Sequence, residues 1–191
     1  MKRRIILAST SPRRIELLKN AGVEFEAVGS DYEEDMTLPM EPKELAKFLS
    51  RGKAEAVARN YDDAIIIAGD TFIAFQGKIL GKPHTEDKAK EMLSMLSGDT
   101  HSVISGITVI DTKSGKVASE AVETFVTFKK LSEKEIDEYI KTGNPLNFAG
   151  SYAIQAVGDK FVEKIEGDYN SIMGLPVFRV VEVLKDFGVE V

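Results

Sequence analysis

A short apolar strand that runs directly into a hydroxyl-rich, cationic turn constrains this chain more than any other feature. Residues 5–8 predict a buried strand and residues 15–18 an early part of a helix, and the segment between them, residues 9–14, reads Ser-Thr-Ser-Pro-Arg-Arg. Proline suits the first position of a helix, and serine hydroxyls can accept hydrogen bonds from the unpaired N–H groups at the helix N-terminus. Because a helix N-terminus favours anions and arginine pairs bidentately with phosphate, the turn predicts a polyphosphate site. A capped helix with surface arginines explains these residues equally well.

Composition limits the classes of protein that this chain can belong to. With 191 residues and 43% apolar content, we expect one domain of residues 1–191, with room for two lobes. A net charge of −6 argues against a nucleic-acid partner. The chain has no cysteine, which excludes disulfides and thiolate chemistry. The apolar run in the first ten residues is too short for a signal peptide or a membrane span, so we expect no membrane association and a cytoplasmic location.

Strand and helix patterns alternate from the N-terminus and predict an α/β fold that opens with a β-α-β unit. Strands are expected at 5–8, 23–28, 64–68, 72–80 (a hairpin), 102–110, 117–128 and 161–165, and helices at 12–21, 42–57, 85–97, 132–142 and 176–184. Residues 30–39 contain four acidic side chains and predict a surface loop. Residues 144–176 are expected to be mostly turns.

Asp70 follows the most apolar strand of the chain, where open α/β sheets place their ligands, and Gly69 before it permits close approach. This position predicts a catalytic or metal-binding residue, although an aspartate that caps local backbone is the alternative. An ordinary aspartate has a pKa of about 3.9, and nearby cations would lower it. Asp70 therefore suits a magnesium ligand better than a proton acceptor unless it is buried, and both roles remain open.

Weaker candidates lie elsewhere in the sequence. Lys53 on the second helix and Lys82 after the hairpin could reach the same end of the sheet as Asp70, but surface lysines are common. Glu33 and Glu34 could bind a divalent ion, although acidic loops are usually just solvated. The small-residue loops 147–155 and 167–176 could surround a ligand, and Gln155 could read the edge of a base. Plain turns are equally consistent with either loop. His84 and His101 receive no role.

Five blocks taken together closely resemble the Maf family of nucleoside triphosphate pyrophosphatases. They are Leu-Ala-Ser-Thr-Ser-Pro-Arg-Arg at 7–14, Gly-Asp-Thr at 69–71, Gly-Lys-Pro at 81–83, Ala-Gly-Ser-Tyr-Ala-Ile-Gln at 149–155, and 167–176. Their order and spacing cover almost the whole chain, which makes the set far more specific than any single block.

The resemblance implies a fold and an activity. The implied fold is an elongated, two-lobed α/β structure of the Maf or inosine triphosphate pyrophosphatase type, with a central twisted mixed sheet, flanking helices and an active-site cleft between the lobes. The implied activity is metal-dependent hydrolysis of a nucleoside triphosphate to the monophosphate and pyrophosphate, with Mg²⁺ or Mn²⁺ as cofactor, usually in a homodimer. A non-catalytic nucleotide-binding regulator of cell division is the alternative that the family's older naming suggests.

The resemblance also implies site residues. Asp70 matches the catalytic aspartate and a metal ligand, and Glu33 matches the family's acidic position after the second strand. Phosphate-binding positions map onto Ser9, Arg13, Arg14, Lys53 and Lys82. The branch that acts on dTTP and UTP has discriminating positions that correspond here to Arg13, Thr71 and Gln155.

One segment departs from the family pattern. The family commonly has Asp-Lys-Ala-Gly-Ala-Tyr-Gly-Ile-Gln-Gly where residues 147–156 read Asn-Phe-Ala-Gly-Ser-Tyr-Ala-Ile-Gln-Ala. A charge pair and two glycines are missing, and these changes bear on loop mobility and substrate preference.

Overall fold

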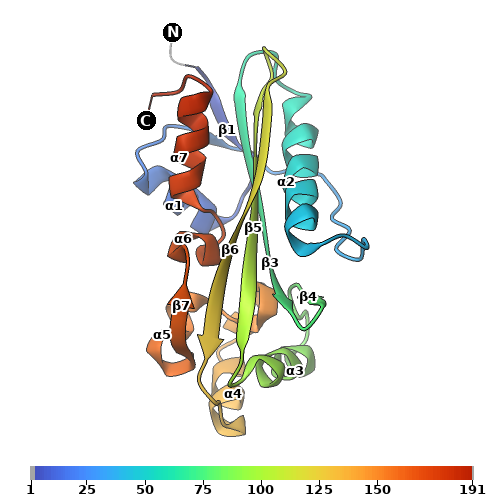
Figure 1. The fold of residues 1–191 in the computed structure, drawn as a ribbon, viewed down its shortest axis with the longest axis vertical. Helices are drawn as coiled ribbons and strands as arrows, with labels where there is room; N and C mark the ends of the chain where they lie inside the picture. Colours follow the sequence, from blue (N-terminus) through green and yellow to red (C-terminus); the bar gives the residue numbers. More distant parts are fainter. Residues whose placement is uncertain (1–2, 191) are drawn as a thin grey trace. The chain divides into compact units, whose positions relative to one another are not determined.

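A computed structural model describes residues 3–190 as a mixed α/β protein with one seven-stranded sheet (Figure 1). The strands are β1 (Ile5–Leu7), β2 (Glu26–Ala27), β3 (Ile65–Phe75), β4 (Lys78–Leu80), β5 (Thr100–Asp111), β6 (Val117–Phe128) and β7 (Val162–Glu166). The helices are α1 (Pro12–Asn20), α2 (Pro42–Ala58), α3 (Glu86–Leu96), α4 (Glu133–Ile140), α5 (Ile154–Phe161), α6 (Tyr169–Met173) and α7 (Val177–Asp186), with 3₁₀ turns at Asn144–Asn147 and Ala149–Ser151. The sheet order is β2-β1-β3-β5-β6-β7, and β4 pairs with β3. The α/β fold class is confirmed.

The chain divides into two compact units, and the long strands pass from one to the other. The first unit contains residues up to 71, 105–122 and from 170 onward, and the second contains 72–104 and 123–169. No helix within residues 3–190 is long and apolar enough to span a membrane.

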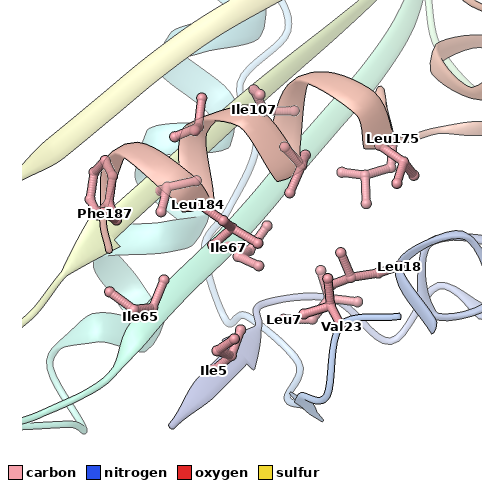
Figure 2. Close-up of a cluster of buried hydrophobic side chains, with 14 of the residues drawn as sticks. Ile5, Leu7, Leu18, Val23, Ile65, Ile67, Ile107, Leu175, Leu184 and Phe187 are labelled. Atoms are coloured by element: carbon pink, nitrogen blue, oxygen red, sulfur yellow. The ribbon is translucent and has the colours of Figure 1, made fainter. Parts of the chain in front are cut away.

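Two apolar layers cover the opposite faces of the sheet in the first unit. On one face, α1 and α7 pack over alternate residues of β1 and β3, including Ile5, Leu7, Ile65 and Ile67 (Figure 2). On the other face, α2 contributes Ala54 and Val57 against the intervening residues Ile6, Ala8, Ile66, Ala68 and Ile110. Because successive strand side chains point to opposite faces, the apolar run that begins β3 fills both cores at once.

Strand β3 is longer than the sequence predicted. The predicted break after residue 68 is wrong: β3 continues through Gly69, Asp70 and Thr71 to Phe75 without interruption. A glycine in a strand interior weakens it but does not end it, and β5 still lies beside this strand in the sheet order. Asp70 is therefore a buried residue inside a central strand and not a turn residue at its end.

Neither the parallel pairing with β1 nor the antiparallel pairing with β4 covers the middle of β3. The β1 register ends where Leu7 faces Ile67, with the Ala8 N–H donating to the Ile67 carbonyl at 2.7 Å. The β4 pairing begins only at Ile73. Asp70 and Thr71 lie in the interval between these two ladders.

The second unit is organised by capped helices and an aromatic cluster. Thr85 accepts from the Lys88 N–H at the start of α3, and Ser132 with Glu135 forms the predicted capping box of α4. The buried His101 imidazole lies edge-on to Phe128 and Tyr152, and its Nε2 is 2.7 Å from the Tyr152 hydroxyl.

The C-terminal third contains more helix than the sequence indicated. Residues 144–176 were expected to be turns around one strand, but α5 and α6 also form there. Helix α5 is interrupted at Gly158, which has φ 40° and ψ −139°, and glycine has low helix propensity, so the sequence favoured a turn there. The strand expected at 23–28 is reduced to the two exposed residues of β2, because Glu26 and Ala27 alone pair with β1.

Candidate active site

A buried lysine between two carboxylates forms the centre of the candidate site. The Lys53 ammonium on α2 lies 2.5 Å from Asp70 Oδ1 on β3 and 2.8 Å from Glu34 Oε1 in the acidic loop. Lys53 and Asp70 retain only 9% and 4% of their exposure, so this ion pair is largely shielded from water. Buried charges persist only when they are paired, and the triad satisfies that condition for Lys53.

The acidic loop reaches Lys53 because it docks onto the turn of α2 that carries this lysine. The Ser30 hydroxyl donates to the Lys53 carbonyl at 3.4 Å and accepts from the Tyr32 N–H at 3.2 Å. The Tyr32 ring lies against Gly52, where an added Cβ would come within 2.3–2.8 Å of three ring carbons. Gly52 thus provides the space that lets the loop lie close enough for Glu34 to pair with Lys53.

Asp70 has one oxygen left over. Its Oδ2 is buried and has no hydrogen-bond partner among residues 3–190, although Oδ1 is paired with Lys53. A buried, unpaired carboxylate oxygen is costly and points to a partner supplied by a ligand or water.

The carboxylates of this site fit a magnesium ion whose ligands come partly from the protein and partly from a substrate. Mg²⁺ is usually bound through one or two carboxylates together with phosphate oxygens. The site supplies Asp70 and Glu34, whereas the described part of the chain contains no cluster of three or more metal-ligating side chains. The residues therefore suit a cation held jointly with a polyphosphate and not one held by protein alone.

The cationic turn after β1 forms largely as predicted. Pro12 begins α1, and the Ser9 hydroxyl, in a residue that is 8% exposed, accepts from the Ser11 N–H at 3.2 Å. Ser11 itself makes no side-chain cap. Arg13 and Arg14 are the second and third residues of the helix, so both guanidiniums belong to its first turn.

Arg14 is oriented by backbone from the other end of the sequence. Its Nε donates to the Gly174 carbonyl at 2.8 Å, which leaves the two terminal nitrogens of the guanidinium for other acceptors. Burial lowers the pKa of Arg14, and the carboxylates of Asp70 and Glu34 oppose that shift. The guanidinium therefore lies within electrostatic range of the Lys53 triad while remaining charged.

Thr71, next to Asp70, belongs to a chain of hydroxyl groups on the opposite face of β3. Its Oγ1 is 2.7 Å from the Ser105 hydroxyl on β5, and Ser105 donates to the Ser171 carbonyl at 2.8 Å. Ser105 is fully buried, whereas Thr71 is partly exposed. Thr71 also lies 3.3 Å from the Gly174 carbonyl that accepts from Arg14.

The two remaining predicted residues lie in the second unit. Lys82 and Gln155 are both exposed. The sequence blocks that contain them meet within that unit, because the Gly150 N–H donates to the Gly81 carbonyl at 3.0 Å.

The structure brings together some predicted residues and adds others. Asp70, Lys53 and Arg14 converge, and Glu34 accompanies them. The resemblance placed the acidic position at Glu33, which is exposed, and its role stays a prediction. Ser105 and Gly174 were not identified as site residues. Buried serines in a strand carry no sequence signal that separates them from ordinary packing.

Comparison with known proteins gives a consistent result. The model of the Maf family, described as Maf-like protein, matches residues 4–187. A relative from Bacillus cereus (strain B4264), named dTTP/UTP pyrophosphatase, is 47% identical over 99% of this chain and 98% of its own length. A second, from strain G9842 and with the same name, is 46% identical over the same shares. Among solved structures, the Staphylococcus aureus Ham1 protein is similar in fold, with a TM-score of 0.53 and 12% identity over 97% of this chain and 99% of that one.

Proposed function

The chain belongs to the Maf family, and from that premise we propose that it hydrolyses dTTP and UTP to the monophosphate and pyrophosphate. The observation that carries the proposal is the Lys53 ammonium, buried between Asp70 and Glu34 and within electrostatic range of Arg14. Positive groups can neutralise a leaving pyrophosphate, and carboxylates beside them can handle a water and a cation.

The reaction places distinct demands on these residues. An oxygen of water bonds to the α-phosphorus while the bond from that phosphorus to the α,β-bridging oxygen breaks, and pyrophosphate leaves with the electron pair. Lys53 and Arg14 would stabilise the negative charge that develops on this leaving group. Asp70 would orient the water and accept its proton, which is then released to solvent.

A divalent cation is part of the proposal. Asp70, through its unpaired Oδ2, and Glu34 would hold Mg²⁺ or Mn²⁺, which when bound would supply charge neutralisation at the phosphate oxygens. Lys53 now pairs with both carboxylates, so its ammonium would turn toward phosphate when substrate is present. Ser9, Arg13 and Lys82 are proposed phosphate contacts, and Thr71 and Gln155 contacts to the base.

Product analysis tests the proposal. Purified protein with Mg²⁺ or Mn²⁺ and dTTP or UTP should release pyrophosphate and monophosphate, so free phosphate should appear only after inorganic pyrophosphatase is added. Release of phosphate and diphosphate would contradict the proposed cleavage site. Nucleotide binding without turnover across both metals would favour the regulator instead.

Two aspartate variants separate catalysis from folding. Asp70→Asn should lower kcat by about 100-fold or more, because the variant loses the carboxylate that orients the water and binds the cation. Asp111→Asn is the matched control, since Asp111 is also buried but pairs with Arg3 and has no part in the site. Equal losses in the two variants would exclude Asp70 from the chemistry.

The homodimer and the cytoplasmic location implied by the resemblance belong to the same proposal. Sedimentation velocity at micromolar concentration tests the dimer, and a monomeric mass would contradict it.

A further inference from the structure

The hydroxyl chain behind Thr71 fixes the direction of its hydrogen bonds. Ser105 has a single hydroxyl proton, and the Ser171 carbonyl at 2.8 Å can only accept it. Ser105 therefore has no proton for Thr71, and across their 2.7 Å contact Thr71 must donate. Among residues 3–190, the other acceptor for Thr71 is the Gly174 carbonyl at 3.3 Å, which belongs to a partly buried residue of the protein. In either arrangement, the Thr71 proton points inward.

As a consequence, the Thr71 hydroxyl can only accept a hydrogen bond from a ligand. A threonine hydroxyl has one donor and two acceptor lone pairs, so Thr71 keeps only acceptor capacity on its exposed side. A ligand atom that meets Thr71 must then carry a hydrogen. Another acceptor at that position would face a lone pair and leave both groups unsatisfied, which is costly in a partly buried site.

The position of Thr71 lets one ligand contact both this hydroxyl and Asp70. The two residues are consecutive on β3, so Asp70 lies on the α2 face and Thr71 on the face covered by α1 and α7. Beyond Ile67, β1 no longer pairs with β3, and β4 pairs only from Ile73. A nucleotide that crosses this unpaired edge can place phosphate near Asp70 and a neighbouring group near Thr71.

We propose that Ser105 is a positioning residue for base selection: by accepting the Thr71 proton it makes Thr71 a pure acceptor that selects bases with an imide N–H. Uracil and thymine carry a hydrogen on N3, whereas the N3 of cytosine is an acceptor. The inference rests on the proposed function, in which Thr71 contacts the base. It assigns the discrimination against cytosine to a buried serine that touches no substrate.

The test is the ratio of kcat/KM for UTP to that for CTP. Ser105→Ala removes the nearer acceptor and leaves only the Gly174 carbonyl at 3.3 Å, so the Thr71 proton can turn outward and donate to cytosine. The ratio should fall about 3- to 10-fold, the effect of one neutral hydrogen bond. Ser105→Thr keeps a hydroxyl with the same capacity and should retain the wild-type ratio.

A matched control separates this role from a general loss of packing. Ser50 on α2 is also fully buried and hydrogen-bonded, to the Lys47 carbonyl and to Thr108. Ser50→Ala should lower the thermal midpoint much as Ser105→Ala does, without changing the ratio. A ratio that falls equally in both variants would overturn the inference.

Thr71→Val provides a second route if Ser105→Ala does not fold. It should lower the ratio by itself, and adding Ser105→Ala to it should change the ratio no further, because Ser105 acts through Thr71. An unchanged ratio in Thr71→Val overturns the inference while pyrophosphate release by the wild type still supports the proposed function. Absence of pyrophosphate release from every nucleotide contradicts the proposed function itself.

Discussion

Gly52→Ala tests how the acidic loop is held against α2. A Cβ at this position would lie 2.3–2.8 Å from three carbons of the Tyr32 ring. Carbon atoms in contact are normally about 3.5–4.0 Å apart, so the ring would have to move by roughly an ångström. The ring is the end of a flexible side chain, so it can move, but it then loses its packing on the helix.

Two effects of similar size oppose each other in this variant. Alanine in a helix interior is favoured over glycine by about 0.5–1 kcal/mol. Displacing the Tyr32 ring from its position costs about 1 kcal/mol in lost packing. We therefore expect Gly52→Ala to leave the free energy of unfolding nearly unchanged in the wild-type background. In a Tyr32→Ala background the clash is absent, and the same change should stabilise by about 0.5–1 kcal/mol.

Urea denaturation of the four proteins in this double-mutant cycle provides the measurement. The expected coupling energy is about 1 kcal/mol. This exceeds the deviation from additivity of about 0.3–0.5 kcal/mol that independent sites show. Equal stabilisation by Gly52→Ala in both backgrounds would refute the reasoning, because the Tyr32 ring would then not depend on the missing Cβ.

Two further predictions concern the buried parts of the two units. Burial lowers the pKa of His101 to about 4, below its ordinary value near 6.5. Between these two values the unfolded chain binds more protons than the folded protein. The free energy of unfolding should therefore fall by about 3 kcal/mol as the pH drops through this window. His101→Gln should flatten that slope in urea titrations at pH 7.5 and 4.5, and an unchanged slope would assign it to other groups. Gly106→Ala should destabilise by about 3 kcal/mol or more, because a Cβ would lie 2.0 Å from the Ala46 carbonyl oxygen, which belongs to helix backbone and cannot rotate away. Gly77→Ala, at φ 74° with open space around it, should cost only about 1 kcal/mol, and similar thermal shifts in both variants would contradict the steric argument.

The accuracy of the sequence-based predictions differed between kinds of feature. Helix starts at Pro12, Thr85 and Ser132 were correct because capping and the first helical turn depend on residues within four positions of each other. Helix α5 was missed because Gly158 breaks its backbone regularity. The strand break at Gly69 was wrongly predicted because local propensity favoured a turn, whereas the neighbouring strand β5 keeps the chain extended.

By itself, the sequence determined the alternation of strands and helices and the cationic turn, and it singled out Asp70 as a candidate site residue, because each depends on residue types at short spacing. The family resemblance added the roles of distant positions such as Lys53 and Thr71. Only the tertiary structure decided that Glu34 pairs with Lys53, that the Gly174 carbonyl accepts from Arg14 and that the Ser105 and Thr71 hydroxyls meet. These are contacts between residues 19 to 160 positions apart, and hydrogen-bond direction and ion pairing require atoms to approach within about 3 Å, which no local pattern specifies.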